Sequence, residues 1–226
     1  MQFNGPVYLQ PPKTGSTTLV SALVENNILI LDSETPTTES FLDKKQHWTY
    51  DQYELSPDLD YAISVRSPYT RYVSLFFQCW WRTTNKVLEP TIINNKSITQ
   101  YKKYLLSLTR TVEFVSSPCV RWLDGITGVV HVIRFESLAD DVRRVYGIDI
   151  NAVEKIEKGG LGTDYKHAVS ESESIAKVLN FYDDSTIALI NNHARTDFDK
   201  FGYTQFKNYQ DMMDFCEHST VKTYDR

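Results

Sequence analysis

The segment from Val7 to Leu19, which reads VYLQPPKTGSTTL, places one lysine and a run of hydroxyl side chains around a single glycine. Its apolar start predicts a short strand, and Gly15 lets the backbone turn tightly and approach a ligand closely. The hydroxyl residues open a helix, whose first backbone N–H groups lack partners within the helix and bind anions. Lys13 adds a positive charge beside them. The segment therefore predicts an anion-binding site.

The order of residues in this loop disfavours two common nucleotide-binding motifs. In a Walker A loop the lysine directly follows the second glycine, whereas here Lys13 precedes Gly15 and Pro12 stands before the lysine. A Rossmann turn needs the Gly-x-Gly-x-x-Gly pattern, and Gly15 is the only glycine in this turn. The sequence therefore argues against ATP or GTP hydrolysis and against dinucleotide binding.

A second segment, from Tyr61 to Phe76, also has the composition of a phosphate site. It reads YAISVRSPYTRYVSLF, so an apolar strand ends at Arg66 and Pro68 breaks it. The helix that then begins carries Ser74. A guanidinium and a hydroxyl that converge on one point bind a phosphate strongly, because hydrogen bonds to charged groups are stronger than those between neutral groups.

Together the two segments resemble the phosphate-binding motifs of sulfotransferases that use 3′-phosphoadenosine 5′-phosphosulfate (PAPS). The resemblance is closest to the carbohydrate O-sulfotransferases of the heparan-sulfate 2-O and 6-O type. It implies transfer of a sulfuryl group from PAPS to a hydroxyl group, with 3′,5′-adenosine bisphosphate (PAP) as the product. It also implies that Arg66 and Ser74 hold the 3′ phosphate, and that Lys13 is catalytic by stabilising charge on the bridging oxygen. The residues implied to bind the 5′ phosphosulfate are Lys13, Thr14, Gly15, Ser16, Thr17 and Thr18.

Further resemblance lies downstream and extends the match to about residues 5–206. Residues 129–141 resemble a strand followed by the family's Arg-Phe/Tyr-Glu-x-Leu turn, and residues 187–203 resemble its closing helix. We expect these two matches to be structural. Between them, residues 158–167 stand where family members have a loop that covers the donor, which implies donor contacts from Lys166 and His167.

The resemblance points to His47 as the catalytic base, because the 6-O type carries its catalytic histidine ahead of a Trp-Thr pair. A neutral imidazole suits the removal of a proton from a hydroxyl group near neutral pH. Carboxylates are the alternative, since other sulfotransferases use them as the base. The candidate carboxylates in this part of the chain are Glu39, Asp51 and Glu54. His131 stands within an apolar strand, so we expect it to be a core residue instead.

The acceptor is expected to be a carbohydrate or a small molecule that bears a hydroxyl group. Trp81 and Arg82 follow the second phosphate segment, and an aromatic face beside a cation suits a sugar ring with an acid group. Two other functions remain open. One is a Mg²⁺-dependent nucleotide or small-molecule kinase with a degenerate phosphate loop, for which Glu136 is the candidate metal ligand. The other is a non-catalytic nucleotide-binding relative.

Composition limits the remaining choices. With 226 residues, 41% of them hydrophobic, the chain is long enough for one well-buried core, and we expect a single domain over residues 1–226. The net charge of −5 argues against a nucleic-acid partner. Three widely separated cysteines predict neither a disulfide framework nor a metal site. Without a recognisable signal peptide or membrane span, a cytoplasmic location is expected. The oligomeric state is not predicted.

The elements that must position these residues follow an α/β order. Apolar runs typical of strands, at residues 7–9, 28–31, 61–65 and 129–135, alternate with helical patterns. This order predicts a three-layer α/β sandwich around a mainly parallel sheet, and the resemblance adds a P-loop-like nucleotide-binding topology. Two apolar stripes at helical spacing predict helices around residues 73–80 and 175–182, and Gly202 is expected to end the last helix of the matched region.

Overall fold

The computed structural model describes residues 2–31, 49–52, 54–77, 95–108, 116–150 and 170–220. The chain divides into two compact units, and each is built from two separate stretches of sequence. The first unit comprises Met1–Arg66 and Cys119–Lys158, and the second comprises Ser67–Pro118 and Gly159–Arg226. Two compact units can still belong to one folding domain, so the single domain expected from the length stays a prediction.

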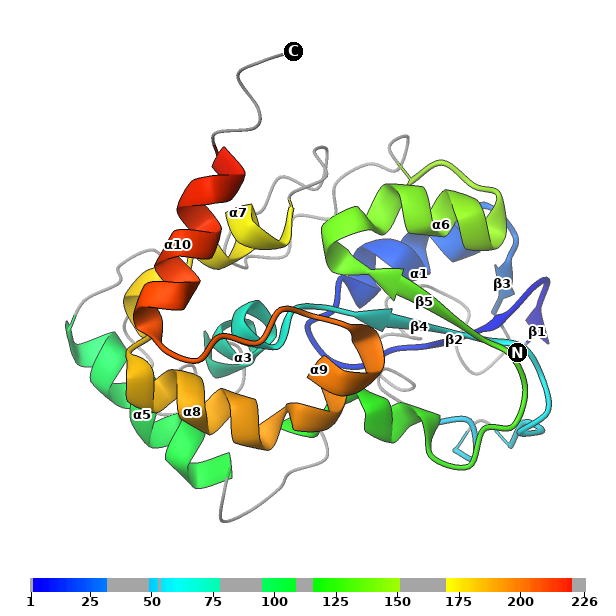
Figure 1. The fold of residues 1–226 in the computed structure, drawn as a ribbon. Helices are drawn as coiled ribbons and strands as arrows, with labels where there is room; N and C mark the ends of the chain where they lie inside the picture. Colours follow the sequence, from blue (N-terminus) through cyan, green and yellow to red (C-terminus); the bar gives the residue numbers. More distant parts are fainter. Residues whose placement is uncertain are drawn as a thin grey trace. The chain divides into compact units, whose positions relative to one another are not determined.

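A three-stranded parallel sheet forms the centre of the first unit (Figure 1). Its strands are β2 (Val7–Leu9), β4 (Tyr61–Val65) and β5 (Val130–Arg134), in the order β2-β4-β5. All five residues of β4 are buried, as expected of a strand at the centre of a parallel sheet. The α/β class and the parallel sheet predicted from the sequence are therefore confirmed.

The strand expected at residues 28–31 forms, but its place in the parallel sheet was wrongly predicted. It is the short strand β3 (Leu29–Ile30), which pairs in an antiparallel manner with β1 (Gln2–Phe3) in a separate two-stranded sheet. The backbone N–H of Asn4 donates to the carbonyl of Ile28 at 2.7 Å and extends this pairing. The short connection after the first helix returns the chain to the N-terminal segment, so β3 pairs there.

Four helical elements complete the described part of the first unit: α1 (Ser16–Glu25), η3 (Cys119–Leu123), η4 (Phe135–Ser137) and α6 (Leu138–Tyr146). Helix α1 buries Leu19, Val20 and Leu23, and α6 packs against β5. Gly147 ends α6 in the left-handed conformation, with φ at 70°. Such a residue satisfies the last carbonyl groups of a helix without strain only when it lacks a Cβ.

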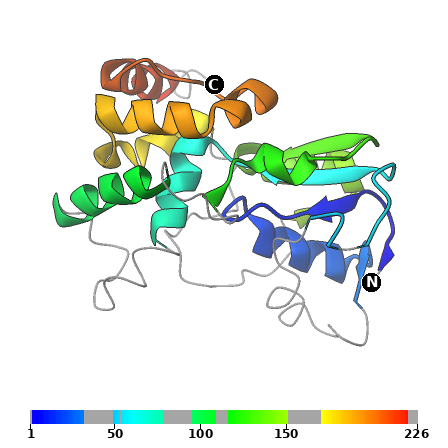
Figure 2. The same cartoon turned by 90° about the horizontal axis from the view of Figure 1, so that it is seen from below.

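The described part of the second unit is helical (Figure 2). Helix α7 packs against α10, and α5 packs against α8. Within the described residues of both units, no helix combines the length and the apolar character needed to cross a membrane. The elements of the second unit are α3 (Pro68–Leu75), α5 (Asn95–Leu108), α7 (Glu171–Ala176), η6 (Leu179–Phe181), α8 (Asp184–His193), α9 (Arg195–Phe201) and α10 (Tyr209–Thr220).

The two apolar stripes correctly predicted buried residues of these helices, but they did not predict where the helices end. Val73, Phe76 and Phe77 are buried as expected, at and just beyond the end of α3. The second stripe is divided between α7 and η6 rather than lying on one helix. The closing helix expected over residues 187–203 is also divided, because α8 ends before Ala194 and α9 begins after it. Gly202 ends α9 with φ at 65°, as predicted.

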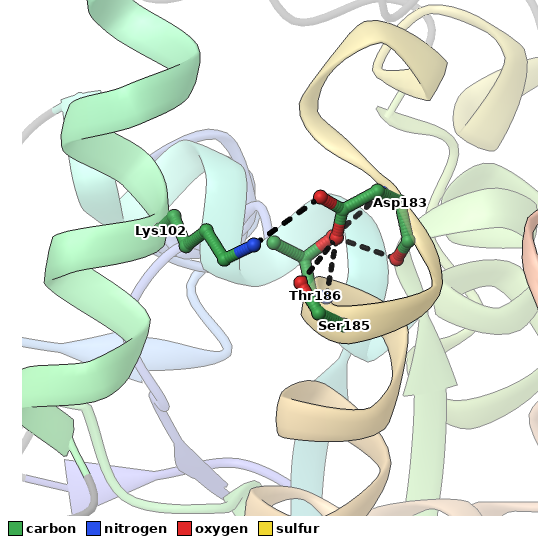
Figure 3. A network of polar contacts seen from close by, with 4 residues as sticks. All are labelled: Lys102, Asp183, Ser185 and Thr186. Carbon is green, nitrogen blue, oxygen red and sulfur yellow. Dashed lines mark hydrogen bonds and ion pairs between the residues drawn. The ribbon is translucent and has the colours of Figure 1, made fainter.

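Asp183 starts α8 and connects it to α5 (Figure 3). Its carboxylate accepts a hydrogen bond from the backbone N–H of Thr186 at 2.8 Å, and the hydroxyl of Thr186 accepts one from the backbone N–H of Asp183 at 2.7 Å. This reciprocal pair satisfies two backbone donors that a helix start leaves without partners. The ammonium group of Lys102 on α5 lies 3.4 Å from the same carboxylate.

Candidate anion-binding site

The loop between β2 and α1 has the backbone geometry of an anion site. Gly15, at the N-cap of α1, adopts the left-handed conformation with φ at 87° and ψ at 13°. Lys13 also has a positive φ, of 66°. The backbone N–H of Leu19 donates to the carbonyl of Gly15 at 3.3 Å, so the N–H groups of residues 16–18 precede the first hydrogen bond of the helix. Gly15 has no side chain to cap them, which leaves the positive end of the helix for an external anion.

A buried chain of hydroxyl groups holds this loop against the sheet. The Thr14 hydroxyl donates to the carbonyl of Pro11 at 2.7 Å and lies 2.5 Å from the Ser64 hydroxyl, which in turn lies 2.6 Å from the Tyr8 hydroxyl. Because each hydroxyl has one proton, the bond to Pro11 sets the direction: Tyr8 donates to Ser64, and Ser64 donates to Thr14. The Thr14 side chain is fully buried, and its hydroxyl bonds within the protein. The backbone N–H of Thr14 is therefore the group that it can offer a ligand.

The Phe135 side chain lies between the loop and Arg66 and is close to both. The Arg66 guanidinium carbon lies over the Phe135 ring, 4.2 Å from its centroid. On the same residue, the ring atom Cδ2 lies only 3.0 Å from where a Cβ on Gly15 would be. Strand β4 lies between β2 and β5, so the approach of Phe135 to Gly15 spans the carboxyl end of β4. The carboxyl edge of a parallel sheet is where α/β proteins bind their ligands.

The register of the sheet explains why Arg66 and Phe135 meet. Val65 is the register partner of Arg134, so the residues that follow them leave neighbouring strands at the same level. Phe135 opens η4, which Asp141 fixes by accepting hydrogen bonds from the backbone N–H of Arg134 and from the Ser137 hydroxyl, both at 2.8 Å. The turn that carries Phe135 is thus tied to α6.

Asp141 also receives a hydrogen bond from the guanidinium of Arg144 at 2.7 Å. Partial burial by itself would raise the pKa of Asp141, but the hydrogen bonds from Arg144, Arg134 and Ser137 outweigh it and lower the pKa. The carboxylate is therefore ionised at neutral pH and acts as a negatively charged anchor for the turn.

The predicted donor-binding residues lie in both units. Lys13, Thr17 and Thr18 are half-buried in the loop and the first turn of α1, and Ser16 is buried beside them. Arg66 is half-buried at the end of β4, whereas Ser74 is half-buried on α3 in the second unit. The structure thus brings the loop and Arg66 together through Phe135. The pairing of Arg66 with Ser74 stays a prediction.

Several other predicted residues lie outside the described part of the chain. They are the proposed base His47, its alternative Glu39, the acceptor candidates Trp81 and Arg82, and the donor-loop residues Lys166 and His167. The alternative bases Asp51 and Glu54 are described and exposed. His131 lies in β5 as expected but is half-buried rather than in the core, because β5 is an edge strand of the described sheet.

Glu136, the candidate metal ligand of the kinase alternative, is buried on η4 next to Phe135. Among the described residues, no group of three or more His, Cys, Asp or Glu side chains is arranged to hold a metal ion. The sequence analysis did not single out Phe135, whose ring lies against both Gly15 and the Arg66 guanidinium. Its signal in the sequence was its position directly after an apolar strand. That it lies level with Arg66 follows from the pairing of β4 with β5.

Comparison of the chain with protein-family models, with curated proteins and with solved structures finds no match.

Proposed function

We propose that this protein transfers a sulfuryl group from PAPS to a hydroxyl group on a carbohydrate or a small molecule. One observation carries the proposal: an open helix N-terminus with an adjacent lysine and an arginine lie at the same edge of the sheet, joined by Phe135. An adenine nucleotide that carries phosphates at both its 5′ and 3′ positions needs two such cationic groups. The proposal includes the P-loop-like topology and three-layer arrangement expected from the sequence.

In this proposal, the backbone N–H groups at the start of α1 hold the 5′ phosphate, and Lys13 neutralises the charge that develops on its bridging oxygen. Arg66 holds the 3′ phosphate, with Ser74 as its proposed partner. The donor supplies an activated sulfuryl group, whose bond to the phosphate oxygen breaks as the acceptor oxygen bonds to sulfur. His47, as the proposed base, takes the proton of the acceptor hydroxyl.

Thermal stabilisation by nucleotides tests the donor site. We expect PAP to raise the melting temperature more than AMP or ATP with Mg²⁺, because a ligand that binds only the native state stabilises it. At a concentration of 100 times Kd the gain is about 2.7 kcal/mol, which corresponds to about 5–10 °C for a chain of this length. Preferential stabilisation by ATP with Mg²⁺ would instead favour the kinase alternative.

Two variants separate binding from catalysis. Arg66→Ala is expected to remove the preference for PAP over AMP, whereas Arg143→Ala, an arginine deletion on the exposed face of α6, should keep it. Lys13→Ala is expected to abolish sulfuryl transfer from PAPS to a panel of glycan and small-molecule acceptors. If Lys13→Ala and Arg66→Ala both keep full transfer activity, the proposed roles of Lys13 and Arg66 are wrong. If the wild-type protein transfers no sulfuryl group to any acceptor of the panel, the proposed function is wrong.

A further inference from the structure

The contacts of Phe135 indicate a role beyond packing. The ring atoms Cδ2 and Cε2 lie 3.0 and 3.4 Å from the position that a Cβ on Gly15 would take. The Arg66 guanidinium carbon lies over the ring, 4.2 Å from its centroid. The ring itself is buried, and Leu138 at the start of α6 lies on the same side of Gly15. A buried aromatic ring has a small number of allowed positions, because protein interiors are close-packed. Its contact partners are therefore held in place with it.

We propose that Phe135 is a positioning residue that fixes the Arg66 guanidinium relative to the phosphate loop, so that tight binding requires a nucleotide with a second phosphate. This inference rests on the proposed function and deepens it, because it names the residue that sets the selectivity between bisphosphate and monophosphate nucleotides. Phe135 does not contact the reacting atoms in this proposal, and it acts through Arg66.

The attraction between a cation and an aromatic face restrains the arginine. An arginine side chain loses considerable rotamer freedom when it binds a phosphate, and a ring beneath the guanidinium removes part of this freedom before the ligand arrives. A guanidinium is a planar fork of N–H donors, so the orientation of its plane decides whether it meets a phosphate with one or two hydrogen bonds. Asp141 on α6 holds the η4 turn that carries Phe135, and so it keeps the ring in place.

The test compares the affinities of PAP and AMP, measured by titration calorimetry, in the full-length protein. Phe135→Leu is expected to weaken PAP binding about tenfold, because Arg66 regains rotamer freedom that it must then lose when it binds the phosphate. AMP binding should change by less than about threefold, because AMP lacks the phosphate that Arg66 holds. Phe135→Tyr keeps the ring and should keep the wild-type ratio. Tyr61→Leu removes a buried ring at the opposite end of β4 and serves as the control for a general loss of packing.

A double-mutant cycle separates positioning from packing. If Phe135 acts through Arg66, Phe135→Leu should cause no further loss of the PAP-to-AMP ratio once Arg66 is alanine. Phe135→Met, whose unbranched side chain adapts to an irregular space, replaces Phe135→Leu if that variant lacks a cooperative thermal transition.

The possible failures are distinguishable. A wild-type protein that does not prefer PAP to AMP refutes the proposed function, and with it the role of Phe135. A wild-type preference that Phe135→Leu leaves intact, or lowers equally in the Arg66→Ala background, refutes the role of Phe135 alone.

Discussion

Replacing Gly15 by alanine tests the geometry of the phosphate loop most directly. Two separate costs arise. The first is backbone strain, because a residue with a Cβ in the left-handed conformation found at Gly15, with φ at 87°, costs about 1–2 kcal/mol. The second is steric, because the new Cβ would lie 3.0 Å from Cδ2 of Phe135, which is buried and lies beneath Arg66. Overpacking of this kind costs about 1–3 kcal/mol.

Gly147→Ala is the matched control. Gly147 has nearly the same backbone conformation, with φ at 70°, and nothing lies within 4 Å of a Cβ placed there. The backbone strain is therefore shared by the two variants, and so is the loss of unfolded-state entropy that alanine brings. The difference between them isolates the contact with Phe135. With a steric cost of about 2 kcal/mol, Gly15→Ala should melt about 4–8 °C below Gly147→Ala.

The assay is thermal and urea unfolding of both variants and the wild type. Both glycines lie in the first unit, so the comparison does not depend on how the second unit unfolds. Combining Gly15→Ala with Phe135→Leu should cost less than the sum of the two single changes, because the smaller side chain makes room for the new methyl group. Equal melting temperatures for the two glycine variants, together with additive costs in the double variant, would refute the contact described here.

Two further predictions concern a buried hydroxyl and a helix cap. Ser64→Ala removes the acceptor of the Tyr8 hydroxyl and the donor to Thr14, and it should lower the free energy of unfolding by about 1–3 kcal/mol. Ser21→Ala, which removes a hydroxyl bonded only to its own helix, should cost less than about 0.5 kcal/mol; equal losses in urea unfolding would contradict the hydroxyl chain. Asp183→Ala should cost about 1 kcal/mol at pH 7 by removing the cap of α8. Partial burial acts to raise the pKa of Asp183, but hydrogen bonds lower it from 3.8 to about 2. The stability that its carboxylate contributes is therefore present above pH 3.8 and is lost as the pH falls through about 2, so unfolding at a series of pH values should show the difference between variant and wild type shrinking in acid. A difference that stays constant from pH 5 to about 2 would contradict this assignment.

Local patterns were enough to predict the elements that carry the site. The strands at residues 7–9 and 61–65 have the bounds expected from their apolar runs, and Gly202 ends α9 as its position suggested. The start of α1 after Gly15 was also predicted, because glycine and hydroxyl residues act on the backbone within one turn of their own position. Such preferences depend on near neighbours in the chain, so they are readable from the sequence.

Long-range pairing was not readable in this way. The sequence does not say that β4 lies between β2 and β5, or that β3 pairs with β1 in a separate sheet, because strand pairing depends on which apolar faces pack together. The same strand pairing also decides whether a single side chain is buried or exposed. Thr14 was predicted to bind the donor; its hydroxyl is buried against Ser64 on β4, so its backbone N–H is the group left for that role.

The sequence by itself determined the chemical groups of this protein: a lysine and an open helix start in one segment, and an arginine at the end of a strand in another. Only the tertiary structure decided that the loop bonds to Ser64 on β4 and that Phe135 lies against both Gly15 and Arg66. The physical reason is that backbone preferences act over a few residues. The meeting of Gly15, Arg66 and Phe135 instead requires three strands, far apart in the chain, to be held in one register by a common buried core.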